Sequence, residues 1–142
     1  MGCSLTITAI QEIQQVLSEA PMTYGKAVKY YRKLYNKSQV ELAAECKVHD
    51  KTIRRIEKEE IYLSLDLCVT IIVNLGMKKD YAWDLINKAG LIGFFNTNQK
   101  AINPRIIYLR YMVDHATKMN LNECNNILID NEMKPLTDGT VE

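Results

Sequence analysis

The chain has 142 residues, of which 47% are hydrophobic and 25% are charged, which is the composition of an ordinary globular protein. This length allows one compact domain, or a small domain with an appended helical segment, and excludes two large domains. Three prolines and six glycines are too few for a disordered or fibrous protein, and polar residues interrupt every apolar stretch well short of the roughly 20 residues of a membrane span.

The N-terminus has neither the positively charged start nor the long apolar core of a secretory signal, so we expect a cytoplasmic protein with reduced cysteines. The four cysteines stand singly, at Cys3, Cys46, Cys68 and Cys124. Three of them fall in apolar-periodic segments, where a thiol behaves as a small hydrophobic group. The sequence therefore predicts no disulfide framework.

The formal net charge of +1 conceals an uneven distribution. Residues 1–22 carry two acids and no base, residues 23–60 carry ten bases against six acids, and residues 61–142 carry eight bases against nine acids. A basic middle third in a nearly neutral chain indicates a local anionic partner, because concentrated lysines and arginines attract phosphate. The alternative is a solvated helix face.

Two amphipathic helices are expected before residue 36. The segment Leu5–Leu17 places five apolar side chains at helical spacing and ends before Pro21. The segment Gly25–Tyr35 repeats this pattern, with apolar side chains on one face and lysines on the other.

The next two segments have the spacing of a helix-turn-helix. Ser38 and Glu41 form a capping box, in which the serine oxygen accepts from the amide three residues on and the glutamate reaches back, so a helix starts there. After about three residues, at 47–49, the apolar period resumes with Ile53 and Ile56. Two short helices separated by a tight turn are therefore predicted.

Capping residues and apolar periodicity predict four more helices, at 65–75, 80–90, 104–119 and 122–129. Ser64 caps the first of these, Gly76 ends it, and Pro104 stands in the first turn of the third. The stretch at 91–103 is predicted to be a loop. Because the sequence has no alternating strand pattern and no internal repeat, the expected fold class is all-α.

The middle of the chain resembles a known family. Ser38-Gln39-Val40-Glu41-Leu42-Ala43, then Val48, then Thr52-Ile53-Arg54-Arg55-Ile56-Glu57, then Ser64-Leu65 to Leu75-Gly76, are similar in this order to the Xre/Cro family of phage and bacterial repressors. The tail is loosely similar to that of short regulators of this family from Gram-positive bacteria and their mobile elements.

The resemblance implies a lambda-repressor-like five-helix DNA-binding domain with an N-terminal helix and a C-terminal helical extension. We accordingly expect an N-terminal helical extension at 1–22, the helix-turn-helix DNA-binding domain at 23–90 and a C-terminal helical accessory region at 91–142.

The second helix of the predicted pair has the two faces that a helix in the major groove requires. Ile53 and Ile56 form its apolar inner face, and basic side chains at spacings of three, four and seven residues form its outer face. The resemblance places base contacts at Asp50, Lys51, Thr52 and Arg55 and a backbone contact at Gln39. The expected DNA-binding residues are Ser38, Gln39, His49, Asp50, Lys51, Thr52, Arg54, Arg55 and Lys58.

The resemblance also concerns four positions outside this DNA-binding set. Arg32 and Glu57 align with a family pair that forms a partly buried ion pair between the first helix and the recognition helix, the alternative being two independent surface charges. Lys47 stands where the family has a turn glycine, and Glu59 stands where a glycine often follows the recognition helix. A lysine with positive φ costs on the order of 1 kcal/mol relative to glycine, which a domain can absorb.

Other patterns support no different class of protein. Met1 to Thr6 fits N-myristoylation, which we do not expect in a repressor-like bacterial protein. Cys46 and His49 have a metal-like spacing, but no second pair follows. His115 stands alone and no phosphate-binding loop or nucleophile elbow is present, so we expect no enzyme, no cofactor and no metal.

We therefore expect a sequence-specific transcriptional regulator, a repressor that binds a palindromic operator in double-stranded DNA as a homodimer. One alternative is an antitoxin or phage-switch component whose C-terminal helices bind another protein. Another is a protein-interaction adaptor that has kept the fold and lost DNA binding. Salt dependence separates these alternatives, because phosphate binding weakens steeply with ionic strength and an apolar interface does not.

Overall fold

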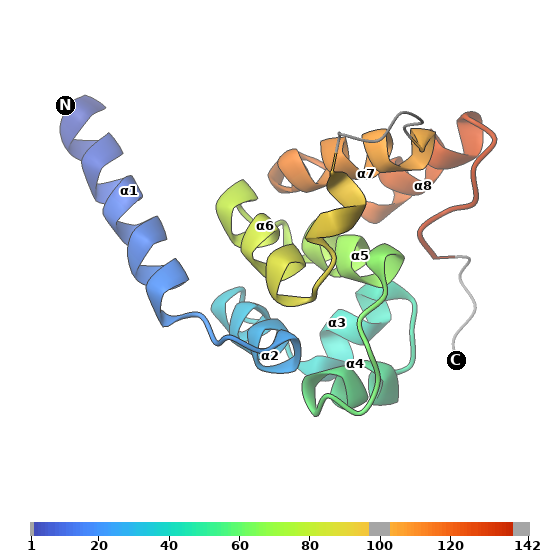
Figure 1. Ribbon diagram of the computed structural model, residues 1–142, viewed down its shortest axis with the longest axis horizontal. Helices are drawn as coiled ribbons and strands as arrows, with labels where there is room; N and C mark the ends of the chain where they lie inside the picture. Colours follow the sequence, from blue (N-terminus) through green and yellow to red (C-terminus); the bar gives the residue numbers. More distant parts are fainter. Residues whose placement is uncertain (1, 97–102, 138–142) are drawn as a thin grey trace.

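The computed structural model describes residues 2–96 and 103–137, with side chains from residue 7 onwards, and these residues form helices and no strand (Figure 1). The all-α fold class expected from the sequence is confirmed for them. In chain order the helices are α1 (Gly2–Glu19), α2 (Tyr24–Leu34), α3 (Gln39–Cys46), α4 (Asp50–Glu57), α5 (Leu65–Leu75), α6 (Lys79–Lys88), the short 3₁₀ helix η1 (Ile92–Phe95), α7 (Pro104–Asp114), the 3₁₀ helix η2 (Ala116–Lys118) and α8 (Leu121–Asp130).

Helix α5 forms the centre of the molecule and packs against α3, α6, α7, α8 and η2 (Figure 1). All its side chains from Cys68 to Val73 are buried. The one polar side chain among them, Thr70, donates its hydroxyl to the carbonyl oxygen of Asp66 at 2.7 Å. A helix that is apolar on all sides is stable only when other elements surround it, which explains why α5 organises the core.

Several predicted helix boundaries differ from the structure, such as 80–90, which is observed as Lys79–Lys88, and three further differences lie after residue 90. The helix expected at 104–119 ends at Asp114 and is followed by η2, because the backbone leaves the helical region at His115, where φ is −122°. The last helix begins at Leu121, one residue early, because Asn120 and Glu123 form a capping box that the sequence analysis missed. The loop expected at 91–103 contains η1, and its residues 97–102 lie outside the described part.

Helix α1 stands away from the body of the molecule along most of its length (Figure 1). Its C-terminal half packs on the core through the half-buried side chains of Ile13, Val16 and Leu17. The side chains of Ile7 and Ile10 continue the apolar stripe toward the N-terminus and are 56% and 50% exposed. The outer half of α1 therefore presents apolar surface to solvent.

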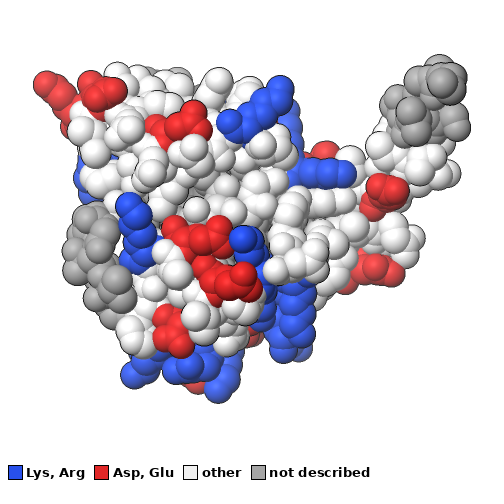
Figure 2. Space-filling view, turned by 180° about the vertical axis from the view of Figure 1, so that it is seen from behind, with Lys and Arg blue, Asp and Glu red and all other residues white. Residues whose placement is uncertain are grey.

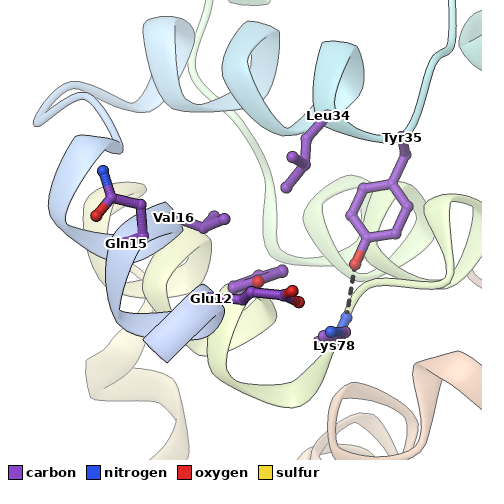
Figure 3. Close-up of a pocket in the computed structure, with 7 residues that line it drawn as sticks. Glu12, Gln15, Val16, Leu34, Tyr35 and Lys78 are labelled. Carbon is purple, nitrogen blue, oxygen red and sulfur yellow. Dashed lines mark hydrogen bonds between the residues drawn. The ribbon is translucent and has the colours of Figure 1, made fainter. Parts of the chain in front are cut away.

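A hollow of about 410 Å³ lies between α1, α2 and α6 (Figure 3). Val16 lines it from α1 and Leu34 and Tyr35 from the end of α2, so its walls are mainly apolar. The backbone N–H of Lys78 donates to the Tyr35 hydroxyl at 3.0 Å and joins the start of α6 to the end of α2.

The described cysteine thiols Cys46, Cys68 and Cys124 are free and buried. Burial raises their pKa values to about 12, about 12 and about 11. Because the thiolate is the reactive form, these three side chains act as apolar packing groups.

Helices α2 and α4 approach each other closely at Gly25, near the start of α2. A Cβ atom at this position would lie 2.5 Å from Cγ of Glu59 and 2.6 Å from the carbonyl oxygen of Ile56. The Gly25 N–H donates to Oε2 of Glu59 at 3.1 Å, so the same close approach forms a hydrogen bond. Glycine is therefore required here for packing, and it sets the distance between the two helices.

A buried ion pair joins the other end of α2 to the same end of α4. Arg32 donates from Nε to Oε2 of Glu57 at 2.6 Å and from Nη2 to Oε1 at 3.0 Å, and the two side chains are only 7% and 4% exposed. A further Arg32 nitrogen, Nη1, donates to the Lys37 carbonyl oxygen at 2.8 Å. Gln39 Nε2 donates to Oε1 of Glu57 at 2.9 Å. One carboxylate thus joins α2, α3 and α4.

The close approach at Gly25 predicts that Gly25→Ala destabilises the protein. Alanine favours a helix interior by about 1 kcal/mol over glycine, but the clash at Ile56 and Glu59 outweighs this preference. We expect the free energy of unfolding, measured by urea denaturation, to fall by about 1–3 kcal/mol. Gly93→Ala is the matched control, since a Cβ there meets nothing within 4 Å. Equal stability of the two variants would contradict the packing role of Gly25.

The buried ion pair predicts that Arg32→Met destabilises the protein by about 3–5 kcal/mol, because the Glu57 carboxylate is left buried without its counter-charge. Adding Glu57→Gln removes that charge and is expected to recover part of the loss. Lys37→Ala is the control, because it breaks a more exposed pair with Glu45 that contributes about 1 kcal/mol or less. The three variants are compared in urea unfolding followed by circular dichroism. A loss for Arg32→Met no larger than that for Lys37→Ala would refute the prediction.

Candidate nucleic-acid interface

Helix α3 begins at the capping box that the sequence predicts. The Ser38 hydroxyl oxygen accepts from the Glu41 N–H at 3.0 Å, and Oε1 of Glu41 accepts from the Ser38 N–H at 3.0 Å. These bonds from the backbone and side chain of Ser38 lower the pKa of the Glu41 carboxyl below its ordinary value. The start of α3 is thereby fixed, although Ser38 and Glu41 are both exposed.

The turn between α3 and α4 contains a residue in the left-handed conformation. Lys47 has φ 59° and ψ 40°, and its N–H donates to the Ala44 carbonyl oxygen at 3.2 Å. The next amide, of Val48, donates to the Ala43 carbonyl oxygen at 3.0 Å. Glu59, just after α4, also has a positive φ, of 62°. At both positions where the family pattern has glycine, the backbone conformation thus favours glycine.

Helix α4 has one buried and one exposed face. Ile53 and Ile56 are fully buried against α2 and α3. Lys51, Arg54 and Lys58 are exposed, and none of these three forms an ion pair within the described residues. Figure 2 shows Lys and Arg gathered along the lower edge of the molecule, where α4 lies in Figure 1. The outer face of α4 therefore offers positive charge to an anionic partner.

The N-terminus of α4 holds two of the expected site residues in contact. His49 is the N-cap, and its Nδ1 lies 3.1 Å from the Lys51 N–H and 2.8 Å from Oδ1 of Asp50. A neutral Nδ1 accepts from the amide, whereas a protonated Nδ1 donates to the carboxylate. Both side chains are about half exposed, at 52% and 41%. They remain accessible to a partner at the start of the helix.

Arg55 and Thr52 lie at the side of the exposed face and are half-buried. Arg55 Nε is 3.5 Å from Oε1 of Glu60, and these side chains are 44% and 51% exposed. An exposed pair of this kind contributes about 1 kcal/mol or less and can be exchanged for another acceptor at little cost.

Gln39 has a structural contact that sequence reasoning missed. Its amide nitrogen donates one hydrogen to Oε1 of Glu57, and the amide oxygen takes no part in that bond. The family resemblance assigned Gln39 to DNA alone. Its contact with Glu57 was missed because a spacing of 18 residues carries no periodic signal.

Tyr62 is a second residue that sequence reasoning missed. It lies in the loop after α4 and is 89% exposed, and its ring stacks beside Tyr24 with centroids 6.1 Å apart. The Tyr24 hydroxyl donates to the Ile61 carbonyl oxygen at 2.8 Å and holds this loop against α2. An exposed aromatic ring next to the basic face enlarges the surface available to a partner.

Two other kinds of site are absent from the described residues. No group of three His, Cys, Asp or Glu side chains there is placed to hold a metal ion. No helix in the described part combines the length and the apolarity needed to cross a lipid bilayer.

Residues 28–81, which run from α2 into α6, match the family model described as Helix-turn-helix. No curated protein and no solved structure matches the chain. The matched family comprises DNA-binding regulatory domains and is not a class of enzyme. Its match covers the capping box at Ser38, the Lys47 turn and the two-faced α4, the same features on which the sequence resemblance depends. Over residues 28–81, the chain is therefore a helix-turn-helix domain of the Xre/lambda-repressor-like family of DNA-binding regulators.

Proposed function

We propose that the protein is a sequence-specific transcriptional repressor that inserts α4 into the major groove of a palindromic operator as a homodimer. The observation that carries this proposal is the two-faced α4, with Ile53 and Ile56 fully buried and a row of basic side chains on the opposite side. A helix that reads DNA needs such an apolar anchor face and a face of donors for phosphates and base edges.

The exposed residues of α4 divide into two roles in this proposal. Lys51 and Arg55 donate to guanine O6 and N7, and Asp50 accepts from cytosine N4. Arg54 and Lys58 contact phosphates and supply affinity without sequence preference. Thr52 also contacts a base edge, whereas His49 at the start of α4, with Ser38 and Gln39 at the start of α3, contacts the DNA backbone.

A homodimer is proposed because one recognition helix covers only a few base pairs. Two-fold symmetry doubles the DNA interface and places the two copies of α4 about 34 Å apart, one turn of the duplex. The exposed Ile7 and Ile10 of α1 and the apolar hollow beside Leu34 support self-association on a flank away from α4 (Figure 3). In this proposal the division at 1–22, 23–90 and 91–142 separates a helical extension, the DNA-binding domain and an accessory region.

A second candidate function is binding of another protein through the C-terminal helices, as in an antitoxin, a phage switch or an adaptor. Ile107 and Tyr111 of α7 are both 55% exposed and lie one helical turn apart. Neighbouring exposed apolar side chains of this kind favour a protein contact. The two functions are compatible in a single chain, since α4 and the outer face of α7 are separate surfaces.

The test of DNA binding is selection from a random duplex pool, followed by fluorescence anisotropy across a range of salt concentrations. We expect recovery of a palindromic site and an affinity that falls steeply with salt. Lys51→Ala with Arg55→Ala is expected to weaken binding to that site by about tenfold or more, because base-edge donors are lost. The control pair, Lys79→Ala with Lys118→Ala, removes the same charge from exposed positions outside α4 and should keep the site preference.

Failure to enrich any site, together with no salt-dependent binding at low salt, would overturn the repressor proposal and favour the protein-binding alternative. Sedimentation of the protein with and without the selected duplex tests the dimer separately. Two copies on one palindrome are expected, and a single copy bound to the full site would contradict the homodimer.

A further inference from the structure

The chain returns to the helix-turn-helix after its last helix. Helix α8 ends at Asp130, and the backbone reverses at Glu132, where φ is 61°. Residues 134–137, which we call the C-terminal strap, then run back past the end of α8 toward the level of α3 and α4 (Figure 1). The strap has no helical periodicity, and nothing in its sequence predicted where it lies.

The strap is anchored in the core by one side chain and two hydrogen bonds. Leu136 is only 6% exposed and belongs to the same buried cluster as α5. Its N–H donates to Oδ1 of Asn125 at 2.8 Å, and Nδ2 of Asn125 donates to the Thr137 carbonyl oxygen at 3.5 Å. The side chain of Asn125, itself 8% exposed, therefore satisfies the strap backbone in the way a neighbouring strand would.

A charged contact joins the beginning of the strap to α5 and α7. Arg105 of α7 donates from Nη1 to the Lys134 carbonyl oxygen at 2.7 Å. The same guanidinium forms an ion pair with Asp66, in the first turn of α5, at 3.1 Å. The strap is thus held from both ends by the accessory helices.

The anchored strap lies across a hollow of about 380 Å³ from the turn between α3 and α4. Lys47 and Val48 of the turn and Thr52 of α4 line one side of this hollow, and strap residues 134–137 line the other. A neighbouring hollow of about 360 Å³ is lined by Lys47 together with Asn125, Pro135 and Thr137. The strap therefore flanks the strained Lys47 turn, which determines how α4 follows α3.

We propose that the strap, through Leu136 and Asn125, is a positioning element for the recognition helix. It forms the wall of the hollow opposite the Lys47 turn and so limits how far the turn, and with it the angle at which α4 meets the major groove, can shift. Base-edge hydrogen bonds demand placement within about 0.5 Å, whereas phosphate contacts made by long lysine and arginine side chains tolerate more displacement. The strap thus contributes to sequence discrimination more than to overall affinity. This inference rests on the proposed function of α4 in DNA binding.

The test compares the full-length protein with Leu136→Ala and Asn125→Ala, using the selected duplex and a scrambled duplex of equal length. We expect both variants to lose about tenfold or more in affinity for the selected duplex while affinity for the scrambled duplex changes by no more than about twofold. Leu136→Met, which preserves volume, is expected to restore discrimination. Ile107→Ala is the control, because it removes the same kind of side chain from an exposed position.

A purely structural role for the strap would lower the active fraction and reduce binding to both duplexes equally, and this result would overturn the inference. Unchanged discrimination in both variants would do the same. If Leu136→Ala does not fold, as judged by circular dichroism, Asn125→Ala decides the question, since it removes the two hydrogen bonds to Leu136 and Thr137 and keeps the buried leucine.

Hydrogen exchange of the free protein gives a readout that does not depend on DNA. The Val48 amide, which donates to Ala43, is expected to exchange faster in the strap variants than in Ile107→Ala, with the amides of central α5 unchanged. If no duplex is selected by the wild-type protein, the proposed function fails, while the exchange at Val48 still shows whether the strap supports the turn. Unaltered exchange at Val48 would refute the support itself.

Discussion

The position of α4 depends first on the Glu57 carboxylate, which is buried at the end of the recognition helix. A carboxylate with only 4% of its side chain exposed is tolerable only with compensating partners, and Arg32 and Gln39 supply them from α2 and α3. Gly25, at the other end of α2, brings that helix into close contact with the same end of α4. Polar and steric constraints thus fix the orientation and the distance of α4 relative to α2, while Ile53 and Ile56 supply the apolar contact.

None of these contacts involves the outer face of α4. Lys51, Arg54 and Lys58 have no ion-pair partner among the described residues, and Arg55 has only the exposed Glu60. The helix therefore combines an inner face that cannot shift with an outer face that is available for binding. Such pre-organisation lowers the entropic cost of forming a specific complex.

Helices whose ends are marked by local side-chain chemistry could be predicted from the sequence. Ser38 and Ser64 mark the starts of α3 and α5, and Gly76 marks the end of α5, because caps act within four residues. The capping box at Asn120 was missed because asparagine is common throughout that region. The contact of Gln39 with Glu57 and the docking of Leu136 onto the core join residues far apart in the chain, so neither periodicity nor spacing reveals them. Sequence reasoning therefore identified the exposed candidate site residues and, through the family resemblance, the Arg32–Glu57 pair that positions α4, and it missed the contacts of Gln39 and Leu136.

The two left-handed residues at the ends of α4 have a dynamic consequence. Lys47 and Glu59 each have a left-handed backbone conformation, which costs an L-amino acid about 1–2 kcal/mol. The eight-residue helix α4 lies between these two residues. Central α5, by contrast, ends at a glycine, which adopts a positive φ at no such cost. We therefore expect a lower free energy of local opening, and more frequent transient excursions, at the two ends of α4 than in α5. Any partner that binds the closed form of α4 suppresses those excursions, so binding and the rigidity of this helix are thermodynamically linked.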